Sequence, residues 1–72
     1  MKTILKIGDY VRHLSTGDLG RVVAYGHEML DSVYLPTLKV EVFSNIEMNR
    51  RIFVEDVSSA WVSLDAEESS RN

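Results

Sequence analysis

Short segments of strand character recur along this chain, and turn-forming residues separate them. β-Branched and aromatic residues are frequent in these segments, and apolar and polar side chains alternate, as on a half-buried pleated strand. The segments lie at residues 10–14, 20–25, 37–43, 50–54 and 60–64. Regularly spaced short strands are typical of small all-β sandwiches and barrels. We therefore predict an all-β closed barrel of about five short antiparallel strands, with one 3₁₀ or helical turn at residues 55–59 before the last strand.

Two of the predicted strands indicate which side chains form the core. Alternation places Val11 and His13 on one face of the first strand, where we expect a partly buried, hydrogen-bonded imidazole. Leu38, Val40 and Val42 share one face of the third strand, and we expect the fourth strand to pair with it as a hairpin.

The connections between the strands differ in length. Residues 15–18 form a predicted turn, because Gly17 adopts positive φ without steric cost. The stretch from Gly26 to Pro36 is longer, and we predict a functional or mobile loop there, since glycine and proline mark its ends. Residues 27–31 could form one helical turn inside this loop.

The chain is long enough for one small domain. We place that domain at residues 1–64 and predict a disordered polar tail at residues 65–72. There is no cysteine, so neither a disulfide nor a thiolate metal site can support the core, and self-association would help by burying more apolar area. The sequence contains no segment of transmembrane length and no signal peptide, so we expect a soluble, cytoplasmic protein without membrane contact.

The first 25 residues carry a family resemblance. Residues 6–13, followed by residues 16–23, resemble the opening hairpin of KOW, Tudor and related SH3-like barrels. The resemblance implies that Gly8 and Asp9 turn the chain into the first strand, that Val11 points into the core and that Gly20 lets the second strand bend. It also implies a one-turn helix before a short final strand. Many unrelated functions share this fold, so the resemblance informs the architecture more than the activity.

One enzyme family has a similar architecture: the plasmid-encoded type II dihydrofolate reductases, which form a tetramer around a central pore. Their chemistry depends on a Val-Gln-Ile-Tyr strand. The corresponding residues 51–54 of this chain are Arg-Ile-Phe-Val and lack both the glutamine and the tyrosine. The reductase activity is therefore not carried over, although an oligomeric enzyme with a site between subunits stays open as a third hypothesis.

Catalytic and metal-binding patterns are weak in this sequence. His27 and Glu28 would begin a zincin motif, but Asp31 stands where the second histidine is needed. Five hydroxyl residues lack a base and an orienting group in their sequence context: Ser15, Thr16, Ser58, Ser59 and Ser63. Gly17 and Gly20 lack the lysine and the helix of a phosphate-binding loop. We expect no enzyme activity, no cofactor and no metal site.

The aromatic residues suggest a binding function. They outnumber what the inner faces need, and tyrosine and tryptophan at a surface are frequent interface anchors. The predicted partner-binding residues are Tyr10, Tyr25, Tyr34, Phe53 and Trp61. The alternative is that these rings cover the open ends of the barrel. We hypothesise a non-enzymatic module that acts through protein–protein contacts, including self-association or addition of a partner's strand to an exposed edge.

Nucleic-acid binding of the KOW or Tudor kind is the second hypothesis. The residues of the predicted domain carry seven basic and eight acidic side chains, so there is no broad basic field to bind phosphates. A local patch for an acidic or single-stranded ligand would consist of Arg12, Lys39, Arg50 and Arg51. Paired arginines on a hairpin also protect an edge strand from aggregation, which is the alternative for Arg50 and Arg51.

Overall fold

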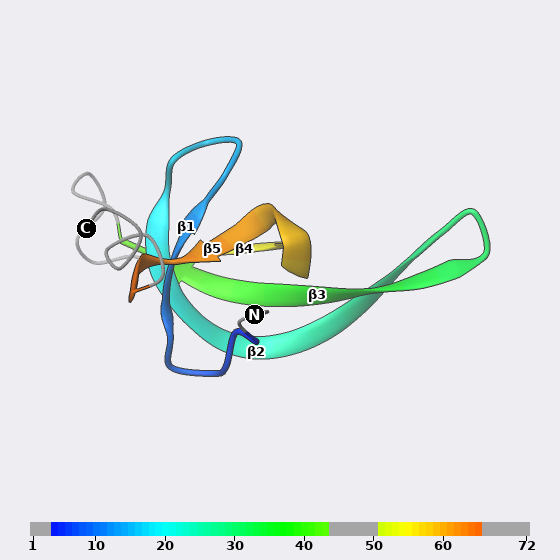
Figure 1. Cartoon of the computed structure of the whole chain (residues 1–72), viewed down its shortest axis with the longest axis horizontal. Coiled ribbons are helices and arrows are strands. Elements are labelled where there is room, and N and C mark those ends of the chain that lie inside the picture. Colours follow the sequence, from blue (N-terminus) through cyan, green and yellow to red (C-terminus); the bar gives the residue numbers. More distant parts are fainter. Residues whose placement is uncertain (1–3, 44–50, 66–72) are drawn as a thin grey trace.

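The computed structural model describes residues 4–43 and 51–65, and its regular structure is built from strands (Figure 1). Five strands and one 3₁₀ turn follow in chain order: β1 (Tyr10–His13), β2 (Leu19–Leu30), β3 (Val33–Val42), β4 (Ile52–Val57), η1 (Ser58–Ala60) and β5 (Trp61–Ser63). The strands form one antiparallel sheet in the order β4-β3-β2-β1-β5. The predicted all-β class, the β3–β4 hairpin and a 3₁₀ turn before the last strand are confirmed, although the turn lies at Ser58–Ala60 and residues 55–57 belong to β4.

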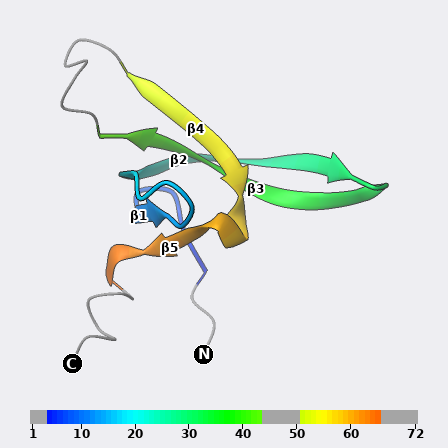
Figure 2. The ribbon, with the colours of Figure 1, turned by 90° about the horizontal axis from the view of Figure 1, so that it is seen from above.

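The sheet is curled but not closed, so the predicted closed barrel is wrong. β4 and β5 form the two edges of the sheet. The turn η1 carries the chain from the end of β4 to the far side of β1, where Trp61 pairs with His13. Figure 2 shows β4 and β5 on opposite sides of the curled sheet. β5 pairs with β1 over its three residues, and among the described strands it has no pairing with β4.

The core lies on the concave side of the sheet. Its buried apolar residues are Val11, Val22, Leu38, Val40 and Trp61, and Leu5, Val42, Val54 and Ala60 pack against them. The predicted inward positions of the first and third strands are confirmed, since Val11 and Val40 are fully buried and His13 is 5% exposed. Alternation along short strands thus identified most of the side chains that hold this small domain together.

The long strand β2 bends away from β1 at two features. Gly20 is buried where β2 pairs with β3, and a Cβ atom at this position would lie 2.5 Å from the carbonyl oxygen of Glu41. A β-bulge then shifts the register to β3 between Val22 and Ala24. Bulges increase the local twist and bend of a strand. The predicted bend of the second strand is therefore present, and it directs the remainder of β2 away from the core.

Residues 26–36 form the outer half of the β2–β3 hairpin, so the predicted loop and its helical turn are wrong. We call these residues the arm. Pairing continues from Gly26 opposite Thr37 to Leu30 opposite Val33. Asp31 and Ser32 close the hairpin with φ angles of 51° and 67°, as in a two-residue turn of type I′. Pro36 is tolerated because β4 pairs with β3 only as far as Thr37, which leaves Pro36 at an edge.

The left-handed turn of the arm gives a first prediction. Ser32 has positive φ, a conformation that glycine adopts without the steric cost of a Cβ atom. We expect Ser32→Gly to stabilise the arm by about 0.5 to 1 kcal/mol and to slow amide exchange at Met29 and Leu30 about two- to fivefold. Hydrogen exchange followed by NMR measures this effect. Faster exchange in the variant would contradict the assigned turn.

Other predicted features fall partly outside the described residues. The turn at residues 15–18 is confirmed, with Gly17 at a φ of 82° and the Asp18 amide donating to Thr16 Oγ1. The tail predicted at residues 65–72 lies outside the described residues except for Asp65, and so does Arg50. Within the described ranges, no helix is long and apolar enough to span a bilayer.

Candidate binding surface

The arm projects beyond the body of the sheet (Figure 1). β1 pairs with β2 only from Leu19 to Arg21, and β4 pairs with β3 only up to Thr37. Among the described strands, the two halves of the arm therefore pair only with each other. An isolated two-stranded hairpin is marginally stable in water, because it lacks a layer that covers its apolar side chains.

Alternation gives the arm two distinct faces. The inner face continues the concave side of the sheet, because Tyr25 pairs with the core residue Leu38. The inner face consists of Tyr25, His27, Met29, Tyr34 and Pro36, and the outer face of Glu28, Leu30, Val33 and Leu35. Both faces expose apolar side chains: Met29 is 58% and Tyr34 69% exposed on the inner face, and Leu30 is 55% and Val33 54% exposed on the outer face.

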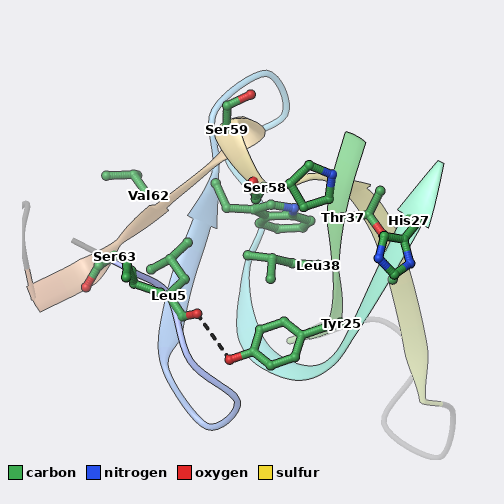
Figure 3. Close-up of a pocket in the computed structure, with 13 residues that line it drawn as sticks. Leu5, Tyr25, His27, Thr37, Leu38, Ser58, Ser59, Val62 and Ser63 are labelled. Carbon is green, nitrogen blue, oxygen red and sulfur yellow. Dashed lines mark hydrogen bonds between the residues drawn. The ribbon is translucent and has the colours of Figure 1, made fainter. Parts of the chain in front are cut away.

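A groove of about 720 Å³ lies at the root of the arm (Figure 3). Its walls come from the N-terminal segment, the root of the hairpin, η1 and β5. The lining residues are Ile4, Leu5, Tyr25, Gly26, His27, Pro36, Thr37, Leu38, Ser58, Ser59, Trp61, Val62 and Ser63. The Tyr25 hydroxyl donates to the Leu5 carbonyl oxygen at 3.3 Å, which links two walls of the groove. Tyr25, His27 and Pro36 belong to both surfaces, so the inner face of the arm and the groove are continuous.

His13 connects three parts of the fold by hydrogen bonds. Its Nε2 atom lies 2.8 Å from Asp56 Oδ2, and its Nδ1 atom lies 3.0 Å from Thr16 Oγ1 and 3.2 Å from Ser15 Oγ. The imidazole also packs on Trp61, with 4.5 Å between the ring centroids. The hydrogen bond from His13, followed by that from the Val57 amide, lowers the pKa of Asp56 below its ordinary value. The predicted hydrogen-bonded, buried imidazole is confirmed.

The same contacts correct the prediction that Ser15 and Thr16 lack a base and an orienting group. Both hydroxyls contact His13, and Asp56 lies on the other side of the ring. Thr16 is closer to the imidazole than Ser15, and its hydroxyl also bonds to Asp18 at 2.9 Å. The imidazole is almost fully buried, and its hydrogen bonds join the β1–β2 turn to β4. No local pattern indicates this cluster, since Asp56 lies 43 residues from His13.

The predicted aromatic residues do not form a single surface. Tyr25 and Tyr34 lie on the inner face of the arm, whereas Tyr10 and Phe53 are exposed on the convex side of the sheet. Tyr10 packs against Phe43 there, at 6.0 Å between the ring centroids. The surface position predicted for Trp61 is wrong, because this side chain is 4% exposed and belongs to the core. Trp61 faces inward from β5, and its Nε1 atom donates to the Asp56 carbonyl oxygen.

The predicted basic residues are brought together only in part. Lys39 Nζ lies 5.1 Å and Arg51 Cζ 5.8 Å from the centre of the Phe53 ring. Arg51 also donates two hydrogen bonds to Glu41, from Nε to Oε2 at 2.9 Å and from Nη2 to Oε1 at 3.0 Å. This interaction is the first cause of the lowered pKa of Glu41. Arg12 lies on β1, separated from β3 by β2. The cationic group is therefore small and is neutralised by a carboxylate.

The residues that sequence reasoning missed are Met29, Leu30 and Val33 on the arm. The available signal was the run of strand-forming residues 33–35 directly after the turn-forming Asp31-Ser32 pair, which Gly26 and Pro36 obscured. Within residues 4–43 and 51–65, there is no group of three or more histidine, cysteine or acidic side chains that could hold a metal ion. Comparison with known proteins found no matching family model, no similar curated protein and no similar solved structure.

Proposed function

We propose that this protein is a non-enzymatic binding module that contacts another protein through the arm and the adjoining groove. The observation that carries the proposal is a projecting hairpin with exposed apolar residues on both faces. Exposed apolar patches on folded domains are typical of interaction sites. Within the part of the chain that the structure describes, no other strand pairs with the edges of the arm, so a partner can add a strand there.

The fold supports an SH3-like origin for the module. The strand order, the curled five-stranded sheet and the 3₁₀ turn before β5 agree with the family resemblance of residues 6–23, and the arm is an extension of the β2–β3 hairpin. The nucleic-acid hypothesis draws its support from the stacking of Lys39 and Arg51 on Phe53. That support is weaker, because Glu41 already binds Arg51 and few cations are left for phosphates.

Selection of a random-peptide display library on the immobilised protein tests the proposed contact surface. We expect enriched peptides whose binding is lost in Met29→Ser/Tyr34→Ser or in Leu30→Ser/Val33→Ser, since either pair removes exposed apolar area from one face of the arm. Phe53→Ser is the matched control, because it removes an exposed ring from the body of the sheet. A peptide set whose binding survives both arm variants would contradict the proposal, as would the absence of both peptide binding and self-association.

A further inference from the structure

Charge is distributed unequally over the arm. Glu28 lies on the outer face and Asp31 lies in the turn, and residues 26–36 contain neither lysine nor arginine. The described residues of the inner face carry no carboxylate or ammonium group, and neither do the described residues that line the groove. Another surface can therefore cover the inner face and the groove without removing a permanently charged group from water, which is the costly step in burying a polar surface.

The inner face carries a projection and a hollow on one continuous surface. Met29 and Tyr34 form a cross-strand pair near the tip, and the groove lies at the root beside Tyr25. Four residues of strand separate Met29 from Tyr25, a distance of about 13 Å. A two-fold contact is reciprocal: if the tip of one copy contacts the groove of its partner, the tip of the partner contacts the groove of the first copy. Two antiparallel copies of this surface would thus place each tip over the other copy's groove.

The size of the surface agrees with a modest interface. Tyr34 and Met29 are more than half exposed, and a tyrosine side chain buries on the order of 200 Å² when it is covered. The five side chains of the inner face offer roughly 500 Å² per copy, to which the walls of the groove add, whereas specific interfaces bury about 600 to 1,000 Å² per partner. The groove volume of about 720 Å³ lies within the range of sites that enclose drug-sized ligands, so it can hold the tip side chains.

We propose that the arm binds a second copy of this chain, with Met29 and Tyr34 of each copy lying in the groove of the other. This inference rests on the proposed function, because it names the partner of the same surface. A basic peptide is the competing occupant, since it would pair with Glu28 and Asp31 on the outer face and tip. The uncharged inner face and groove favour the second copy. Contacts at the small end of the size range are typically weak and transient, so we expect a dissociation constant on the order of 10⁻⁵ M.

Sedimentation velocity from about 1 to about 500 µM protein brackets the expected constant. We expect the wild-type protein to shift from monomer to dimer across this range. Met29→Glu/Tyr34→Glu should weaken the dimer at least about tenfold, because it places carboxylates in an uncharged contact. Leu30→Glu/Val33→Glu is the matched control: the neighbouring cross-strand pair receives the same two charges on the outer face, and we expect a change of less than about threefold.

A groove variant tests where the tip lies. Ser58→Glu adds a carboxylate to the groove and leaves the arm unchanged, so it should weaken the dimer as strongly as the tip variant. Far-UV circular dichroism of each variant verifies the fold.

A wild-type monomer throughout the range, an equal effect of the outer-face pair or an unaffected Ser58→Glu dimer would each overturn the proposal. Arm-dependent peptide binding by a strict monomer would reject the second copy and retain the proposed function, and basic peptides that require Glu28 would identify the competing occupant.

Discussion

Gly20→Ala is expected to destabilise the protein by about 3 kcal/mol, because the added methyl group meets atoms that cannot move aside cheaply. A Cβ atom at this position lies 2.5 Å from the carbonyl oxygen of Glu41 and 2.5 Å from Cγ1 of the fully buried Val40. Relief of the clash requires β2 and β3 to separate at the centre of the sheet. Since a domain of this size has a total stability of roughly 4 to 10 kcal/mol, urea unfolding would show a large shift of the midpoint.

Gly26→Ala is the control for this prediction. Its Cβ atom would also meet close neighbours, but these are side-chain atoms of Glu55 and Thr37, and Glu55 is an exposed side chain that can rotate away. We expect a loss below about 1.5 kcal/mol and recovery of part of it in the Gly26→Ala/Glu55→Ala double variant. Unfolding of both glycine variants at the same urea concentration would contradict the prediction, because the close approach of β2 and β3 at Gly20 would then not be the cause of the destabilisation.

The sequence was informative wherever local alternation decides which side of a strand is buried. Val11, Val40 and Leu38 were placed correctly, because one face of each strand is covered and a shift of one residue would expose the whole set. The 3₁₀ turn was also predictable from the short polar stretch between β4 and β5. These features depend on a few neighbouring residues.

The arm was not predicted because the glycine and the proline at its ends are compatible with strands only through tertiary contacts. Gly26 lies beneath the Glu55 side chain, and Pro36 stands just beyond the last residue that β4 pairs with. Both residues are compatible with strands only because of where another strand lies, which no local pattern reveals. Closure of the sheet was mispredicted for a related reason, since it depends on the direction in which η1 sends the chain.

The candidate site shows the same division. Tyr25 and Tyr34 were selected correctly as exposed rings, but their common face with Met29 follows from the register of the hairpin. Trp61 was assigned to the surface because tryptophan is frequent at interfaces, whereas the three-residue strand β5 directs this side chain inward. Residue type thus indicated which rings are exposed, and the pairing of β2 with β3 determines which of them share the inner face of the arm.

Removal of the His13 side chain should have the second large effect, a loss of about 3 kcal/mol in His13→Ala. The substitution leaves a cavity beside Trp61 and breaks the hydrogen bonds that join the β1–β2 turn to β4. His13→Phe is the control, because it keeps a ring against Trp61 and loses only the hydrogen bonds. We expect it to cost about 1 kcal/mol, since Thr16 and Asp56 are partly exposed and can bind water instead. Urea unfolding at neutral pH measures both variants, and equal losses would show that packing on Trp61 contributes little.

The pH dependence of the same pair separates its charge from its packing. Asp56 has a pKa below its ordinary value of 3.8 in the folded state, first because His13 donates to it and second because the Val57 amide does. A depressed carboxyl pKa contributes stability that is present above the unfolded-state pKa and is lost as the pH falls through the lower folded-state value. We therefore expect wild type to be more stable than Asp56→Asn at pH 5 and the difference to shrink steadily toward pH 2. Glu41, whose pKa is also lowered, is common to both proteins, so its contribution cancels in the comparison. A difference that stays constant between pH 5 and pH 2 would mean that the Asp56 charge does not stabilise the link between β4 and the β1–β2 turn.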